Sequence, residues 1–261
     1  MRPEAAPLPA ENAPSVAYVV LDADLQRADA RRFDRLLAGF AAGYAAMFHG
    51  DEAESSAQWT GRILGKAQPQ PVMRIAVAVQ GSGETERVIG GAACEYYRAG
   101  GCALCTYLYV LDRPEYRHRG HARALLDTAL LACATLGPVR AALAEVEWPP
   151  LLPTTRFGSQ LIADAQRRLH FFERLGARRI TLDYVQPALG PAQQSVPWLR
   201  LLLLPTPDAQ DEPSLRRALD LFLEEFHSAL AQEAGRALDA ALLESQRVQV
   251  ASAPTLIVPL H

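Results

Sequence analysis

The sequence predicts an α/β protein built on a mixed, mainly antiparallel β-sheet flanked by helices, with an extra helical segment at its C-terminal end. Three strand-like runs joined by short turns follow one another between residues 73 and 111, which predicts an antiparallel meander. A helical apolar period begins at Gly120 and precedes another strand-like run, which predicts a crossover connection. The 261-residue chain is 49% hydrophobic and 21% charged, a balance typical of a globular protein with a sizeable core.

The N-terminal part begins with residues 1–14, rich in Ala and Pro, which predict a flexible arm without the apolar stretch of a secretory signal. Val16–Leu21 predicts a first strand. Apolar residues at helical spacing predict an amphipathic helix from about Asp29 to His49, and a shorter helix follows around Ala57–Gly65.

The meander consists of strands predicted at Met73–Gln80, Arg87–Tyr97 and Cys102–Leu111. The helix that begins at Gly120 carries an apolar stripe as far as Cys133. Further elements are predicted in the order strand, helix, strand, strand, at Val139–Trp148, Ala163–Leu175, Ile180–Val185 and Trp198–Leu204.

The C-terminal part begins with a linker at Pro205–Pro213. One long helix is predicted over Leu215–Leu243, and Thr255–Leu260 predicts a terminal strand. The chain therefore divides into an arm (1–14), a domain (15–204) and an extension (205–261). Because the apolar stripe of the long helix must be covered, we expect it to pack on its own domain or to pair across a homodimer, and the dimer is favoured.

Charge and composition exclude several classes of partner. With 26 Lys and Arg against 29 Asp and Glu, the net charge of −3 argues against a nucleic-acid binder. No apolar run approaches the roughly 20 residues that span a bilayer, so we expect a cytoplasmic protein without a membrane partner. Cys102 and Cys105 form a C-x-x-C within a predicted strand, where a three-residue offset places the thiols on opposite faces. Ordinary packing is favoured there over zinc or redox chemistry.

The segment from Tyr107 to Ala122 is the most informative one. A hydrophobic strand runs into a loop that carries Arg117 and Arg119, and the loop opens at Gly120 directly into a helix. The free N–H groups of a first helical turn and the small residues there suit a pyrophosphate. The alternative is an ordinary helix start with small residues for packing and solvated arginines.

These residues resemble the acetyl-CoA signature of the GNAT N-acetyltransferase superfamily, R/Q-x-x-G-x-G/A, with Arg117, Gly120 and Ala122 in its fixed positions. A second stretch, Arg168–Ala177, is similar to the family's later helix, which commonly ends L-Y-E-K-L-G-F. The resemblance extends from about Val16 to Leu204. It implies the GNAT fold, acetyl-CoA as co-substrate, and a primary amine of a small molecule or peptide as acceptor.

The resemblance also implies roles for individual residues. The strand end should offer backbone groups to the pantetheine arm, and the loop amides should hold the pyrophosphate with help from Arg117 and Arg119. The implied cofactor-binding residues are Tyr109, Val110, Leu111, Arg117, His118, Arg119, Gly120, His121, Ala122 and Phe172. Two of them depart from the pattern: His118 stands where Gly is common, and Phe172 stands where many members carry a tyrosine that protonates the departing thiolate.

The candidate catalytic residues are Glu145, Glu95 and Tyr184. Glu145 and Glu147 lie two apart on a strand and share a face, where like charges would raise one pKa into the range of a general base. The alternative is a solvated edge with two ordinary carboxylates. Glu95 is the other candidate base, and Tyr107, Tyr109 and Tyr184 could line an aromatic acceptor pocket or belong to the core.

No metal site is predicted. His118 and His121 stand three apart at a helix start, but no carboxylate motif accompanies them, so they are interpreted as surface histidines near phosphate. Two rival functions stay open. One is a non-catalytic acyl-CoA-binding module, and the other is a different nucleotide binder, which the preceding antiparallel meander disfavours.

Overall fold

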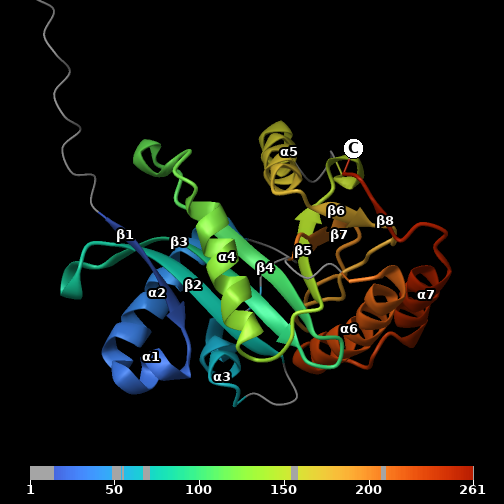
Figure 1. Ribbon diagram of the computed structural model, residues 1–261, viewed down its shortest axis with the longest axis horizontal. Coiled ribbons are helices and arrows are strands. Elements are labelled where there is room, and N and C mark those ends of the chain that lie inside the picture. Colours follow the sequence, from blue (N-terminus) through green and yellow to red (C-terminus); the bar gives the residue numbers. More distant parts are fainter. Residues whose placement is uncertain are drawn as a thin grey trace, which may run out of the picture.

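The computed structural model describes residues 15–48, 54, 56–66, 71–153, 158–206 and 210–260. These residues form one eight-stranded sheet with the strand order β1-β2-β3-β4-β5-β7-β6-β8 (Figure 1). Its strands are β1 (Val16–Leu21), β2 (Val72–Gln80), β3 (Arg87–Tyr97), β4 (Cys102–Val110), β5 (Ala141–Glu147), β6 (Arg178–Ile180), β7 (Leu199–Leu204) and β8 (Ile257–Val258). The predicted arm, residues 1–14, lies outside the described residues.

Seven α-helices are found in the described residues. They are α1 (Ala23–Ala28), α2 (Ala30–Met47), α3 (Trp59–Ile63), α4 (His121–Ala134), α5 (Ser159–Arg174), α6 (Glu212–Glu233) and α7 (Ala240–Ser252). Aspartates cap α1, α2, α6 and α7, where each carboxylate accepts a hydrogen bond from a backbone N–H of the first turn. No helix among the described residues combines the length and the apolarity that crossing a bilayer requires.

The mixed sheet confirms the predicted fold class. Strands β1 to β4 pair antiparallel in sequence order, and α4 then carries the chain across to β5, which lies parallel to β4. The parallel pairing begins at Cys102↔Ala141 and ends at Cys105↔Ala144. Because β4 continues to Val110 and β5 to Glu147, the two strands diverge beyond these last partners.

The two faces of the sheet are covered by different helices. Helix α4 packs on one face, together with Phe172 of α5. Helices α2 and α3 cover the opposite face over β2 to β4, and α6 covers it further along, over β3 to β5. As predicted, Cys102 and Cys105 belong to cores on opposite faces, and the four cysteines are buried and free.

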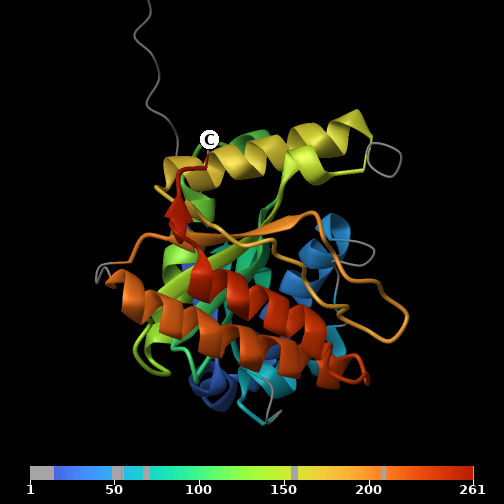
Figure 2. The ribbon, with the colours of Figure 1, turned by 90° about the vertical axis from the view of Figure 1, so that its right-hand side faces the viewer.

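The predicted single helix over Leu215–Leu243 is wrong: α6 and α7 are two helices, separated by a turn in which Gly235 has a φ of 61°. They lie side by side (Figure 2). Phe222 and Phe226 of α6 pack edge-on against Tyr97 of β3, with ring centroids 5.0 and 5.9 Å from that of Tyr97. The apolar side of α6 is therefore covered by its own sheet, which removes the argument that favoured a dimer.

The strand predicted at Ile180–Val185 is also wrong beyond its first residue. The Leu182 N–H donates to the Ile180 carbonyl at 2.9 Å, and this tight turn takes the chain out of the sheet. Leu182 and Tyr184 nevertheless stay buried, since the turn directs them into the core beneath α6. The predicted terminal strand is confirmed in shortened form as β8, which pairs with β6.

Candidate active site

The loop after β4 leads into α4 with two residues in the left-handed region. Gly120, the N-cap of α4, has a φ of 76°, and His118 has a φ of 57°. A Cβ built on Gly120 would meet no atom within 4 Å, so open space lies in front of this backbone. The loop is anchored by Tyr116, which is buried and donates its hydroxyl to Gln80 Oε1 at 3.0 Å. An anion can therefore approach the helix start closely.

A cavity of about 260 Å³ lies at this loop and is strongly basic. Its lining includes one acidic residue, Asp112, against four arginines and two histidines. These basic residues are Arg117, Arg119, Arg123, Arg174, His118 and His121. Arg117 Nε donates to Asp112 Oδ1 at 2.7 Å. Burial lowers the pKa of His121, with a further contribution from the charge of Arg119. A basic cavity at a helix N-terminus suits a polyanion such as a pyrophosphate.

The structure brings most of the predicted cofactor-binding residues together. Val110, Leu111 and all residues from Arg117 to Ala122 line the basic cavity. The Tyr109 side chain instead points toward α2 and donates its hydroxyl to the Phe40 carbonyl at 2.9 Å, and its backbone stands in register with Gly91 of β3, so Tyr109 does not line the basic cavity. Phe172 lines a second cavity.

That second cavity, the central cleft, lies where β4 and β5 diverge and has a volume of about 230 Å³. Glu95 of β3, Cys105–Leu108 of β4 and Glu145–Glu147 of β5 contribute to its lining. Phe172 of α5 and Phe226 of α6 close other sides. At the point of divergence β4 carries a bulge, because Ala93 pairs with Tyr107 while Cys94 pairs with Cys105.

Glu145 is held by two donors in the central cleft. The Tyr184 hydroxyl donates to Glu145 Oε1, and Gln186 Nε2 lies 3.0 and 3.1 Å from the two carboxylate oxygens. Tyr184 is fully buried, and its burial, followed by the charge of Glu145, raises its pKa well above the ordinary value. Tyr184 thus stays protonated and serves as a donor that orients Glu145.

Glu147 also lines the cleft, but it is engaged by a different element. Arg168 of α5 contacts both of its carboxylate oxygens, with Nε 2.8 Å from Oε2. The two carboxylates that share a face of β5 therefore have separate partners, an amide and a hydroxyl for Glu145 and a guanidinium for Glu147.

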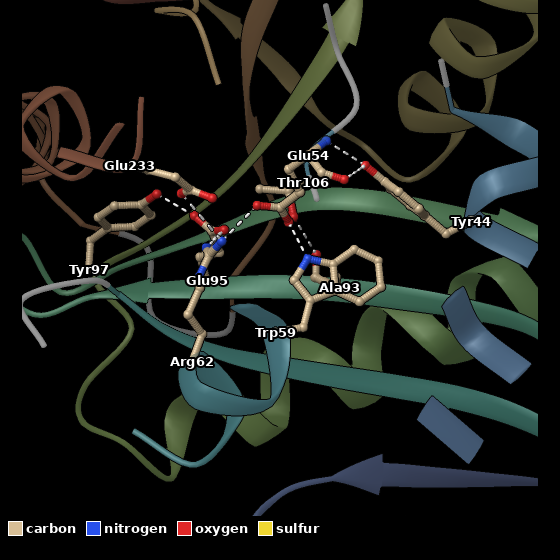
Figure 3. Close-up of polar contacts among 9 residues, drawn as sticks. All are labelled: Tyr44, Glu54, Trp59, Arg62, Ala93, Glu95, Tyr97, Thr106 and Glu233. Carbon is tan, nitrogen blue, oxygen red and sulfur yellow. Dashed lines mark hydrogen bonds and ion pairs between the residues drawn. The ribbon is translucent and has the colours of Figure 1, made fainter. Parts of the chain in front are cut away.

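Glu95 belongs to a buried ionic cluster beside the cleft (Figure 3). It forms an ion pair with Arg62 of α3 and accepts a hydrogen bond from the Tyr97 hydroxyl. Arg62 also donates to Glu54 at 2.7 Å, and its guanidinium lies 3.8 Å from Glu233 of α6. Burial raises the pKa of Glu233, and the charge of Glu54 raises it further. The positive charge of Arg62 offsets part of this increase.

Sequence reasoning missed Glu54, Arg62, Gln186 and Glu233. They come from a segment before β2, a short helix, a loop and the C-terminal extension, and no motif links them. The nearest signal was the apolar stripe of α6, which required a surface to pack against but did not show which one. Among the described residues, no group of three or more His, Cys, Asp or Glu side chains is arranged to hold a metal ion.

No protein-family model matches the sequence, and no curated protein matches it significantly. Three solved structures illustrate the structural similarity. Arabidopsis thaliana NAA60 bound to a bisubstrate analogue is 15% identical to this chain and has a TM-score of 0.40. The alignment covers 73% of this chain and 98% of the NAA60 chain. Diaminobutyrate acetyltransferase from Paenibacillus lautus is 14% identical over 76% and 99% of the two chains, with a TM-score of 0.44.

The third structure is a tandem GNAT protein from the clavulanic acid biosynthesis pathway, which is 22% identical and has a TM-score of 0.41. The alignment covers 66% of this chain and 46% of the tandem protein. At these identities and TM-scores the matches establish no shared activity. A function for this chain has to rest on its own residues.

Proposed function

We propose that this chain is an acyl-CoA-dependent N-acetyltransferase of the GNAT superfamily, which transfers the acetyl group of acetyl-CoA to a primary amine. One observation carries the proposal: β4 and β5 separate after Cys105 and Ala144, with a basic loop at the end of β4 and a cleft in the gap. A thioester on an extended arm can enter such a gap while its pyrophosphate binds the loop.

The chain's residues suit acetyl-CoA as a substrate. Beyond Cys105 the edge of β4 no longer pairs with β5, so backbone groups up to Val110 are placed to bind the amides of the pantetheine arm. The amides of residues 118–122, together with Arg117, Arg119 and Arg174, are placed to bind phosphates. The open space at Gly120 supports this assignment.

Glu145 is the base that we favour, since it lies in the cleft and its orientation is fixed by Tyr184 and Gln186. The amine loses a proton to Glu145, directly or through water, and its nitrogen attacks the thioester carbonyl. The C–N bond forms, the C–S bond breaks, and the new amide nitrogen releases its remaining excess proton to solvent. The CoA thiolate takes a proton from solvent, because Phe172 has no proton to give. Glu95 remains the alternative base, and Tyr184 is a positioning residue.

The rival function is a non-catalytic acyl-CoA-binding module, which the phenylalanine at position 172 favours. The test measures CoA release from acetyl-CoA with a thiol reagent, in the presence and absence of a panel of primary amines. We expect amine-dependent release of CoA together with an acetylated amine in the mass spectrum. Binding of acetyl-CoA without amine-dependent turnover would support the rival instead.

A further inference from the structure

The central cleft carries an excess of negative charge. Four carboxylates line it, those of Glu54, Glu95, Glu145 and Glu147. Among the described residues, Arg168 is the one cationic side chain in this lining. Arg168 contacts Glu147. A cleft with this charge balance attracts cations and repels anions.

The ionic cluster behind the cleft does not remove this excess. In the cluster, the guanidinium of Arg62 is surrounded by three carboxylates, those of Glu54, Glu95 and Glu233 (Figure 3). One positive charge therefore faces three carboxylates in a buried environment, where charge interactions are screened less than in water. A cation that enters the cleft beside Glu54 and Glu95 would relieve this repulsion.

A second observation points to a ligand that donates hydrogen bonds. Gln186 lines the cleft and is 6% exposed, and its backbone is fixed by two hydrogen bonds with Val196, at 3.0 and 2.8 Å. Its Nε2 donates to Glu145, while its Oε1 has no donor among the described residues. A buried acceptor without a donor is costly. An amine bound beside Glu145 would supply the missing N–H once the Gln186 amide turns its oxygen toward the cleft.

Aromatic rings line the cleft near Glu54. Phe48 and Tyr107 pack edge to face with centroids 5.0 Å apart, and both contribute to the lining. Ring faces attract ammonium groups, and the attraction grows when the cation is desolvated. The same part of the cleft thus combines carboxylates with aromatic rings, which is a combination that suits an alkylammonium group.

We propose that the acceptor is a small aliphatic diamine or polyamine, a proposal that rests on the proposed acetyl transfer. The reacting nitrogen binds between Glu145 and Gln186, and a second, charged nitrogen binds beside Glu54 and Glu95. The cleft volume of about 230 Å³ is below the roughly 300–1,000 Å³ of sites for drug-sized ligands, which favours a slender aliphatic chain.

The test compares acceptors that differ only in the charge at the far end. Wild-type enzyme is assayed with α,ω-diamines from ethylenediamine to 1,6-diaminohexane, and with the monoamine and the ω-amino acid of each chain length. For the best chain length, we expect kcat/KM to fall about tenfold or more from diamine to monoamine, and again to the amino acid. The optimum length then reports the spacing of the two nitrogen sites.

Four outcomes would overturn the proposal. Equal kcat/KM values for diamine and monoamine, or a preference for the amino acid, remove the second cationic site but leave acetyl transfer intact. A lysine-containing peptide that exceeds every diamine shows that the acceptor is a peptide. No CoA release with any amine overturns the proposed function as well.

A variant locates the second site. Glu54→Gln should lower kcat/KM for the best diamine about tenfold more than for the matched monoamine. The ratio of the two kcat/KM values reports the preference for the diamine and not the overall activity. Glu84→Gln, in the exposed turn between β2 and β3, is the matched control and should keep the wild-type preference. An unchanged preference in a folded Glu54→Gln protein contradicts the assignment, and the wild-type acceptor series decides the proposal should that variant fail to fold.

Discussion

Cys105 and Ala144 are the last residues that join β4 to β5, and the side chains that follow them line the central cleft. Thr106 follows Cys105 in the bulge of β4, and Glu145 follows Ala144. The position at which the two strands part therefore fixes which carboxylate of β5 lies next to the point of divergence. It also fixes where the unpaired edge of β4 begins.

The first prediction concerns the basic loop. Acetyl-CoA or CoA should raise the melting temperature of the wild-type protein, since a ligand at 100 times its Kd stabilises the folded state by about 2.7 kcal/mol. Gly120→Val should abolish this shift, because the side chain would occupy the open space in front of the helix start. Differential scanning fluorimetry with and without CoA measures both.

Gly235→Val is the matched control. Gly235 also has a positive φ, 61°, and a Cβ there would likewise meet nothing within 4 Å, so both variants place a β-branched residue in the left-handed region. The control should keep the CoA shift. An undiminished shift in Gly120→Val would show that the nucleotide binds elsewhere.

The second prediction separates the two candidate bases. Glu145→Gln keeps the shape of the side chain but removes its basicity, and kcat should fall by roughly 10²–10⁴ while the CoA-induced thermal shift is retained. Glu95→Gln removes one of the three carboxylates around Arg62 but leaves Glu54 as its ion-pair partner, so it should cost less than the roughly 3–5 kcal/mol of stability that is lost when a buried charge is left unpaired. Urea denaturation and steady-state kinetics of both variants make the comparison.

The opposite pattern would place the base on β3. In that case Glu145→Gln turns over at nearly the wild-type rate, and Glu95→Gln loses activity at temperatures where it is still folded. Near-full activity in both variants would mean that the amine binds in its neutral form and that positioning provides the catalysis.

The third prediction concerns the role of α6 in the core. Phe222 is 0% exposed and packs against Tyr97, so Phe222→Ala should cost about 3–5 kcal/mol in the free energy of unfolding. Leu131→Ala, at a side chain that is 72% exposed, should change it by no more than about 0.5 kcal/mol. Equal denaturation midpoints for the two variants would show that α6 is not part of the folded core in solution.

The sequence allowed the sheet and the basic loop to be predicted because both depend on local signals. Three strand-like runs separated by short glycine-containing turns specified β2, β3 and β4, and the glycine before an apolar stripe specified the start of α4. Alternation placed Glu145 and Glu147 on one face of β5, and the choice of Glu145 between them rested on the strand register that the family resemblance implies.

The rest depended on long-range packing. Tyr184 was expected in a strand, and it instead lies in a loop whose turn at Thr181 no local signal indicated. The partners of Arg62 come from β3, from α6 and from the segment before α3, so only the folded chain brings them together. The break between α6 and α7 was missed because the apolar period continues across Gly235.

The fourth prediction concerns the buried His227 of α6. It is 1% exposed, its Nε2 lies 3.1 Å from Gln246 Oε1 of α7, and Gln246 Nε2 donates to the Val185 carbonyl. Burial lowers the pKa of His227, although the hydrogen bond with Gln246 and the charge of Asp239 oppose the shift. A histidine in the unfolded chain titrates near 6.5. Below that pH the unfolded state binds more protons at this position than the folded state, so the contribution of His227 to stability falls as the pH falls.

His227→Gln keeps an N–H donor for Gln246 but cannot titrate. The free energy of unfolding of the wild-type protein should therefore decrease more steeply than that of the variant between about pH 6.5 and the lowered pKa, by up to about 1.4 kcal/mol per pH unit. At pH 7.5 the variant should be the less stable protein, because the shorter side chain leaves a gap in the core between α6 and α7. The difference in stability between the two proteins should shrink on acidification.

Urea denaturation of both proteins at about pH 7.5, 6.5, 6.0 and 5.5 measures how steeply each free energy of unfolding changes with pH. Parallel slopes would mean that His227 takes up its proton in the folded state as readily as in the unfolded chain.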